Sequence, residues 1–321
     1  MTDLDSFRNR LAKNHRHWSR WARRQVIDCY RVYDRDIPQF PLAIDRYGEH
    51  VHLQEFDTGW RLTKAEYDAW VDAVVAAVIE TLGLPPEHVH YKRRERQRGS
   101  EQYRKLRAAA SESAVREAGL SFLVNLDSYV DTGLFLDHRN TRAYVRERAR
   151  GSRFLNLFSY TSSFTVYAAA GGAASSESVD LSNTYLEWAS RNFRLNGIDP
   201  GRHALVRADA FGWLSEAVRQ RRQFDLIVLD PPSFSNSAKM RDVLDVTRDH
   251  PRLVDHCMAL LADGGELIFS TNRRGFVLDE SLQQRHRCEA IHNWTVPDDF
   301  RNRSPHLCWR IHHGQQDKSA N

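Results

Sequence analysis

The sequence lacks several features that would place it in a special class of protein. Its longest stretch of apolar and small residues, Phe164 to Ala174, falls well short of the roughly 18 to 20 residues that a membrane span needs. The first residues carry acids where a signal peptide carries positive charge, and no apolar stretch follows them. Cysteine is scarce, and the four cysteines have neither metal-ligand spacing nor the pattern of a disulfide framework: Cys29, Cys257, Cys288 and Cys308. We therefore expect a cytoplasmic globular protein with no metal and no membrane partner.

Positive charge is concentrated in the first third of the 321 residues. The net charge is only +4, but residues 1–31 hold eight Arg or Lys against three acids, and residues 92–107 hold eight against two. Such an asymmetry favours a polyanionic partner. Aromatic side chains that could stack on unpaired bases lie within or beside these runs, at Trp18, Trp21, Tyr91 and Tyr103. RNA is therefore the partner that we expect.

The second basic run supplies the RNA-binding candidates, which are Lys92, Arg93, Arg94, Arg96, Arg98, Arg104 and Lys105. A charge run is also typical of a solvated helical face, and the sequence does not decide between the two interpretations.

The pattern of the first third predicts a small α+β domain over residues 1–125. Residues 5–25 have the spacing of a basic amphipathic helix, and short strands follow at 29–33, 42–45 and 51–56. Apolar residues from Tyr67 to Leu82 predict a second helix, which Gly83 ends. We expect the basic run 92–107 to be a loop or an exposed helix.

The rest of the chain has a different organisation, in which apolar strands alternate with helices over residues 126–313. This order predicts an α/β domain with a doubly wound, mostly parallel sheet that has helices on both faces. Residues 314–321 look like a polar tail. Ligands of such sheets bind outside the carboxyl ends of the strands, so those ends hold the candidate site.

Three of these strand ends have residues suited to a nucleotide-like ligand. The first is followed by small and hydroxyl residues, 156–163, without the G-x-G-x-x-G fingerprint of a dinucleotide fold. The second ends at Asp180, which suits bidentate hydrogen bonding to ribose hydroxyls, although Asp180 or Ser182 could simply cap the next helix. The third is followed by Asp209, which suits an adenine amino group or, again, a helix cap.

The fourth strand end carries the most specific motif, Asp230-Pro-Pro-Ser-Phe234. Its two prolines fix the backbone after a buried strand and direct the following groups into the cleft.

These residues, in this order, resemble class I S-adenosylmethionine-dependent methyltransferases, and the resemblance implies a Rossmann-like α/β fold with a sheet of seven strands. Four longer segments are similar to the C-terminal half of the bifunctional ribosomal RNA large-subunit methyltransferase K/L family: 131–139, 154–161, 179–188 and 230–237. The likeness extends to 11–14, 29–34 and 94–99 in the first domain. That half of the family methylates N7 of a guanine in 23S rRNA, so the resemblance implies this activity, S-adenosylmethionine as cofactor and rRNA or a large-subunit precursor as partner.

The resemblance also implies roles for individual residues. Asp137 and Arg139, with Phe135 in the same motif, would reach the methionine end of the cofactor, although Asp137 also suits a cap on a helix over 138–149. The turn after the first strand would line the cofactor, and the next two strand ends would hold its ribose and adenine. These three groups are Phe158, Ser159, Tyr160 and Thr161, then Asp180, Leu181 and Ser182, then Asp209 and Ala210. Asp230 would border both the cofactor and the reacting centre.

The chain departs from the family in two ways. Ser162 stands where the family has glycine, and serine restricts a backbone position that glycine leaves free. The guanine-N2 half of the bifunctional family is not in this sequence, so we expect the chain to find its RNA with its own basic first domain.

The chemistry of N7 methylation matches what the site contains. Guanine N7 bears a lone pair and no proton, so alignment with the sulfonium methyl does most of the work and no general base is needed. Asp230 is suited to stabilising the cationic product, with Pro231 shaping the turn. Phe234 and Asn236 are our candidates for stacking on the base and bonding its edge, although Phe234 could instead pack beneath the loop.

Three alternatives remain. Cytosine-C5 methylation needs a cysteine thiolate, and no cysteine follows Asp230-Pro-Pro. Amino-group methylation usually accompanies an aromatic residue where Ser233 stands. A non-catalytic RNA-binding or assembly factor on a methyltransferase fold is the third, and Ser162 with the basic first domain is its support.

Overall fold

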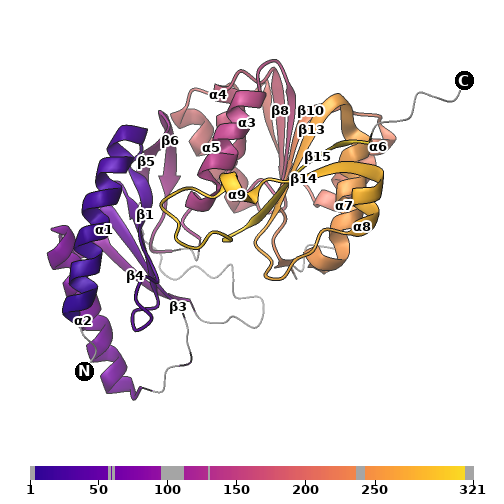
Figure 1. Cartoon of the computed structure of the whole chain (residues 1–321). Coiled ribbons are helices and arrows are strands. Elements are labelled where there is room, and N and C mark those ends of the chain that lie inside the picture. Colours follow the sequence, from indigo (N-terminus) through magenta and orange to yellow (C-terminus); the bar gives the residue numbers. More distant parts are fainter. Residues whose placement is uncertain are drawn as a thin grey trace, which may run out of the picture. The chain divides into compact units, whose positions relative to one another are not determined.

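The computed structural model describes residues 4–56, 59, 62–94, 112–128, 131–235 and 243–314 (Figure 1). The chain divides into two compact units. The first comprises Met1–Leu136 with Asp298–Asn302, and the second comprises Asp137–Pro297 with Arg303–Asn321. None of the described helices is long and apolar enough to cross a membrane.

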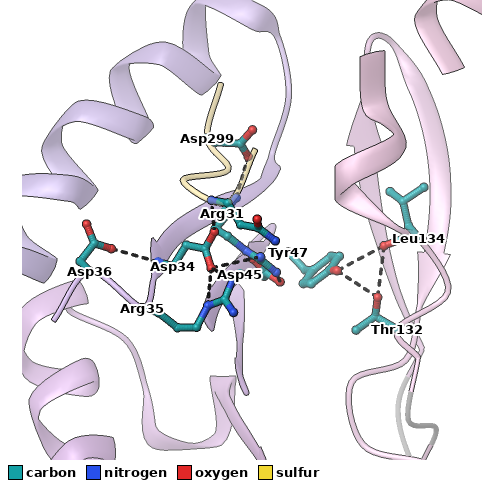
Figure 2. Close-up of polar contacts among 10 residues, drawn as sticks. Arg31, Asp34, Arg35, Asp36, Asp45, Tyr47, Thr132, Leu134 and Asp299 are labelled. Carbon is teal, nitrogen blue, oxygen red and sulfur yellow. Dashed lines mark hydrogen bonds and ion pairs between the residues drawn. The ribbon is translucent and has the colours of Figure 1, made fainter. Parts of the chain in front are cut away.

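The unit boundary lies further along the chain than the sequence pattern suggested. We expected it between residues 125 and 126, whereas the structure places it after Leu136. The intervening residues bond to the first unit: the Tyr47 hydroxyl lies 2.9 Å from Thr132 Oγ1 and donates to the Leu134 carbonyl at 3.3 Å (Figure 2). The Asn125 amide donates to the Thr132 carbonyl as well. These bonds hold residues up to 136 in the first unit.

The first unit is built on a four-stranded sheet in the order β1-β2-β3-β4, with β3 and β4 parallel and the other neighbours antiparallel. Two helices supply apolar side chains to its main core, and a separate hairpin of β5 and β6 follows. The elements are α1 (Leu4–Gln25), β1 (Cys29–Asp34), β2 (Leu42–Tyr47), β3 (His50–Phe56), α2 (Lys64–Leu82), β4 (Val89–Arg94), β5 (Ser113–Glu117) and β6 (Leu120–Val124). A short 3₁₀ turn, Pro86–His88, precedes β4.

The ends of α2 show why this helix forms where the sequence predicts it. Thr63 and Glu66 form a reciprocal capping box at its start. Gly83 closes its end in the left-handed conformation, with φ 63°, and donates its amide to the Ile79 carbonyl. The basic run after β4 was expected to be a loop or helix, but its first three residues, 92–94, complete β4 because they pair with residues 54–56 of β3.

A segment from late in the chain, Asp298–Asn302, belongs to the first unit. Asp299 accepts a hydrogen bond from the Arg31 amide at 2.8 Å, as Figure 2 shows. Asp34 accepts from the Asn302 amide at 2.9 Å. The Arg31 guanidinium lies 4.2 Å from the Phe300 ring centroid and makes a bidentate pair with Asp45, at 2.7 and 2.8 Å. No local sequence pattern predicts this return, because its partners lie far away along the chain.

The second unit contains the predicted seven-stranded sheet, in the order β14-β15-β13-β10-β7-β8-β9. The five strands from β13 to β9 are parallel, and β15 and β14 are antiparallel to their neighbours. The seven strands are β7 (Arg153–Leu157), β8 (Ser175–Asp180), β9 (His203–Arg207), β10 (Phe224–Leu229), β13 (Leu261–Thr271), β14 (His286–Ala290) and β15 (Leu307–His313). The mostly parallel α/β prediction is confirmed.

Helices cover both faces of this sheet (Figure 1). They are α3 (Arg139–Arg148), α4 (Ser163–Ala170) and α5 (Asn183–Leu195) on one side, and α6 (Ala210–Arg219), α7 (Val246–Leu260) and α8 (Glu280–Arg285) on the other. The short strands β11 (Phe234–Ser235) and β12 (Leu244–Asp245) lie between α6 and α7 in the chain, and the short helix α9 (His292–Thr295) follows α8 and β14. A 3₁₀ turn, Leu136–His138, precedes α3. The central strands are strongly apolar because they are buried on both faces. Of the expected tail, Gly314 alone lies within the described residues.

Candidate active site

Strand order places the candidate residues at one edge of the second sheet. β7 lies between β10 and β8, and the chain runs from β7 to β8 in one direction across the sheet and to β10 in the other. Such a switch point opens a crevice outside the carboxyl ends of the strands. The turn after β7, Asp180 at the end of β8 and Asp230 after β10 therefore share this edge.

The turn after β7 has an unusual backbone. Phe158, Tyr160 and Ser162 all have positive φ, at 55°, 51° and 58°. Each such non-glycine residue costs of order 1 kcal/mol or more, and strain of this kind clusters at binding sites. Ser162 thus adopts the conformation that the family's glycine favours, and it is fully buried. Serine at position 162 therefore keeps the backbone conformation that glycine would adopt, but at a cost in conformational energy.

Asp180 holds this turn in place. Its two carboxylate oxygens accept hydrogen bonds from the Tyr160 amide at 2.9 Å and from the Ser182 amide at 2.8 Å. Burial raises the pKa of Asp180 to about 6, although these amide donors act to lower it. Ser182, not Asp180, caps α5, because its hydroxyl accepts from the Tyr185 amide. Leu181 lies between them, partly buried.

Two buried hydroxyls of the same turn lack a protein partner. The hydroxyl oxygens of Ser159 and Ser162 have no hydrogen-bond partner within the part of the chain that the structure describes. Leaving a buried polar group unsatisfied costs about 1–3 kcal/mol, so such groups usually mark a ligand or ordered solvent. Thr161 is also buried, and its carbonyl accepts from the Asn192 amide group at 3.0 Å. Unsatisfied hydroxyls beside the buried carboxylate of Asp180 suit a polar ligand such as a nucleoside-bearing cofactor.

Asp209 caps α6, because its side chain accepts from the Gly212 amide at 2.9 Å. Ala210 is buried and begins the helix. The capping role is therefore established, and contact between Asp209 and adenine stays a prediction.

Asp230 is held from two sides. Ser270, near the end of β13, donates its hydroxyl to one carboxylate oxygen at 2.6 Å, and His138 Nε2 lies 3.6 Å from the other. Pro231 is buried, as a residue that fixes the turn should be. Phe234 pairs with Asp245 between β11 and β12 and is 53% exposed, and its stacking on the acceptor base stays a prediction. Asn236 lies outside the described residues.

A pair of stacked histidines lies beside Asp230, and the sequence analysis missed it. The rings of His138 and His306 are 4.1 Å apart and tilted by only 15°. His306 Nδ1 lies 3.0 Å from Asp137 Oδ2, and its Nε2 lies 3.3 Å from the Thr295 hydroxyl. Burial, helped by His306, lowers the pKa of His138 to about 4, so this ring is neutral at physiological pH. His138 follows Asp137 directly in the chain, but nothing in the sequence connects either residue to His306.

This cluster gives Asp137 a role other than the helix cap that was considered. The residue before α3 is His138, which makes no side-chain capping bond, and Asp137 pairs with His306 instead. Asp137, His138 and His306 also have metal-ligand atoms within 4.8 Å of one another. Their geometry does not suit a shared ion, because the lone pairs of nearly parallel stacked rings do not converge within a metal–nitrogen bond of about 2.0 Å. Instead, the hydrogen bonds of His306 to Asp137 and Thr295 hold its ring against His138, which lies beside Asp230.

The other two residues of this motif lie on either side of the unit boundary. Arg139 begins α3 and is buried in the second unit, whereas Phe135 belongs to the first unit and is 41% exposed. Their contact with the methionine end of the cofactor stays a prediction.

Three residues of the predicted RNA-binding run are described, and Arg93 among them is exposed. Lys92 is partly buried, and this burial lowers its pKa to about 8. The Arg93 guanidinium lies 4.7 Å from the Tyr67 ring centroid, and Arg94 ends β4. The other candidates, Arg96, Arg98, Arg104 and Lys105, lie outside the described residues.

The aromatic residues expected to stack on bases are engaged in packing. Trp18 and Trp21 pack against the core of the first unit and meet edge to face at 5.6 Å. The Tyr91 hydroxyl donates to the Glu55 carboxylate. Tyr103 lies outside the described residues.

None of the four cysteines is fully accessible for attack on a base. Cys29, Cys257 and Cys308 are buried, and Cys288 is partly buried. Burial raises the pKa of the Cys257, Cys288 and Cys308 thiols. Buried thiols of this kind are inert, since the thiolate is the reactive form.

Comparison with known proteins agrees with this geometry. Residues 87–306 match the family model of S-adenosylmethionine-dependent methyltransferases. The chain is 58% identical over 313 residues to ribosomal RNA large subunit methyltransferase K of Neisseria meningitidis, covering 98% of this chain and 88% of that protein. It is 49% identical over 306 residues to ribosomal RNA large subunit methyltransferase K/L of Pseudomonas aeruginosa, covering 95% of this chain but only 42% of that protein.

The chain is also similar to solved structures that are assigned as methyltransferases. A protein from Streptococcus mutans that is assigned as a SAM-dependent methyltransferase has a TM-score of 0.77 and 25% identity, covering 97% of this chain and 82% of that one. A structure with the same TM-score, identity and coverage, also assigned as a methyltransferase, is complexed with SAH, the demethylated cofactor.

Proposed function

We propose that this chain, which belongs to the family of S-adenosylmethionine-dependent methyltransferases that includes the ribosomal RNA large subunit methyltransferases K and K/L, methylates N7 of a guanine in 23S ribosomal RNA. The observation that carries the proposal is the near full-length match, at 58% identity, to a relative named for this RNA. The chain spans less than half of the K/L relatives, so the proposal concerns the part of their activity that lies in the matched half. We infer that it acts in the cytoplasm, where rRNA is transcribed and assembled.

The residues of the second unit fit S-adenosylmethionine, which supplies the electrophilic methyl group. Asp180 accepts from the Tyr160 and Ser182 amides, and in this proposal its carboxylate would also accept from the ribose hydroxyls. The Ser159 hydroxyl, buried and without a described partner, is available to a polar group of the cofactor. The strained turn around Ser162 brings backbone close to the ligand.

The environment of Asp230 suits a reaction in which positive charge develops and no proton must leave. Ser270 and His138 hold its carboxylate, so its charge is in place before the reaction begins, and this preorganisation favours a cationic product. His138 is neutral because of its burial, so it does not offset that negative charge. The accessible ring of Phe234 offers a stacking surface for the acceptor base.

Cytosine-C5 methylation is the nearest alternative, and the cysteines argue against it. That reaction requires a thiolate to attack the base. Cys308 is the cysteine whose pKa responds to the charge of Asp230, yet its thiol is fully buried and its pKa is raised, which disfavours the thiolate.

The test is to incubate the purified chain with methyl-labelled S-adenosylmethionine and unmodified 23S rRNA, digest the RNA and identify the labelled nucleoside by mass spectrometry. We expect 7-methylguanosine. A matched Asp230→Asn variant, which keeps the shape but removes the charge, should lower kcat more than it changes KM. Labelled 5-methylcytidine would overturn the proposal in favour of the alternative.

The absence of label has two distinguishable meanings. Calorimetric titration with S-adenosylhomocysteine separates them, because a non-catalytic assembly factor on this fold would show no binding. Binding without methylation of naked RNA, followed by methylation of large-subunit precursor particles, would retain the chemistry and change the form of the substrate.

A further inference from the structure

Helix α1 has one apolar face and one strongly basic face. Phe7, Leu11 and Ala22 are buried in the core of the first unit. The opposite face exposes a series of cations at intervals of mostly three and four residues: Arg10, Lys13, Arg16, Arg20, Arg23 and Arg24. The helix holds seven Arg or Lys in total and a single acid, Asp5.

Most of these cations have no structural role. Within the described residues, Arg8 is the cation of α1 with ion pairs, to Asp5 and Glu80. Arg23 and Arg24 are in the last turn, where positive charge favours the helix dipole. We call the other four, Arg10, Lys13, Arg16 and Arg20, the α1 stripe.

The α1 stripe costs the helix stability. Like charges three or four residues apart repel by about 0.2–0.5 kcal/mol per pair, and the stripe contains three such pairs in succession. No described ion pair offsets this repulsion. Since this repulsion lowers the stability of the helix and no described contact compensates for it, we look for a function of the stripe other than stabilising the fold.

The neighbouring helix shows that the basic surface is specific to α1. α1 and α2 contact each other and pack on the same core (Figure 1). α2 carries one cation, Lys64, against four acids, Glu66, Asp68, Asp72 and Glu80. A generally solvated surface would mix both signs, whereas here the two helices have opposite net charge.

We propose that the α1 stripe binds the phosphate backbone of the RNA substrate. This rests on the proposed function and adds a docking surface to it. From Arg10 to Arg20 the helix rises about 15 Å, enough to contact several consecutive phosphates. Salt-sensitive phosphate contacts of this kind position an RNA without reading its sequence.

The experiment compares two triple variants of the full chain. One replaces Arg10, Lys13 and Arg20 by glutamine. The control replaces Arg194, Arg202 and Arg219 by glutamine and so removes the same charge. These three arginines are exposed and lie near the end of the second sheet where its strands begin, whereas the active site is at the carboxyl ends of the strands. Binding to transcribed 23S rRNA is measured between about 50 and 200 mM salt, without cofactor, so the result does not depend on methylation.

The stripe variant should bind the RNA roughly ten-fold or more weakly, and its slope of log affinity against log salt should fall by about 2 to 3 units. Its stability to urea should be unchanged or raised, because repulsion is relieved. Equal effects of the two triple variants, an unchanged salt slope, or no RNA binding by the parent chain would each overturn the proposal. If methylation fails while these binding differences hold, the fault lies with the proposed reaction and not with the surface.

Discussion

Replacing Asp180 by asparagine should make the cofactor-free protein more stable while weakening its hold on the cofactor. The carboxylate is buried at the end of β8, and its pKa rises from an ordinary 3.8 to about 6. The folded chain therefore binds this proton more tightly than the unfolded chain does. The stability that this gives is fully present below pH 3.8 and is lost as the pH rises through about 6.

The size of the effect follows from the shift. A difference of 2.2 pKa units corresponds to at most about 3 kcal/mol, present as a penalty on the wild type above pH 6. Asparagine has the shape of the protonated acid and keeps one oxygen for the Tyr160 or Ser182 amide, so it escapes the penalty. The variant should be more stable by about 3 kcal/mol near pH 8, and this gain should shrink to about 1 kcal/mol near pH 4.5.

Urea unfolding of the apo protein at both pH values measures the difference, and calorimetry with S-adenosylhomocysteine measures the loss of affinity. Two ribose hydroxyls lose a charged acceptor, so we expect affinity to fall roughly 10- to 100-fold. Asp209→Asn is the matched control for the stability measurement alone, because asparagine caps a helix as well as aspartate does and α6 should keep its stability. A stability difference for Asp180→Asn that is independent of pH, or a net loss near pH 8, would refute the reasoning from burial.

Three further predictions concern strain, a buried histidine and a buried ion pair. Ser162→Gly should stabilise the protein by about 1 kcal/mol in urea unfolding, because glycine adopts a φ of 58° without strain; a loss of stability would mean that the hydroxyl has a partner. His138 resists protonation, so stability should fall by up to about 3 kcal/mol as the pH drops from 6.5 to 4, and His138→Gln should remove that part of the pH dependence. Arg31→Leu leaves the Asp45 carboxylate buried without its bidentate partner and should cost about 3–5 kcal/mol. Adding Asp45→Asn should recover part of the loss, and a strictly additive double variant would contradict the coupling.

The fold could be predicted largely from local pattern. The strands that bury both faces have continuous apolar runs, as in Leu226–Leu229 of β10, and the helices between them have clear starts and ends. The alternation of these elements restricts the sheet to a parallel, doubly wound arrangement. The same order indicates which strand ends meet, so Asp180 and Asp230 could be named as neighbours of one crevice.

What the sequence did not reveal depends on contacts between distant residues. His306 pairs with Asp137, which lies 169 residues earlier in the chain, and no rule of sequence spacing links two residues so far apart. The return of Asp298–Asn302 to the first unit depends on Arg31 and Asp34 in the same way. Arginine in a basic N-terminal stretch looks like surface charge, but Arg31 is nearly buried because Asp45 and Phe300 enclose it.

The functional regions are also the places where this chain departs from local stability rules. Every second residue of one turn, Phe158, Tyr160 and Ser162, has a positive φ that favours glycine. The carboxylate of Asp180 is buried beside this turn. The α1 stripe places like charges next to one another on a helix. A sequence selected for stability alone would lack this backbone strain, this buried carboxylate and this charge repulsion. The stability gains that we expect for Asp180→Asn and Ser162→Gly follow from the same reasoning. Within the described residues, these features occur together with unsatisfied hydroxyls and with α1 cations that make no ion pair. This is what our proposals require, because a cofactor at the turn and RNA on α1 would supply the compensating interactions.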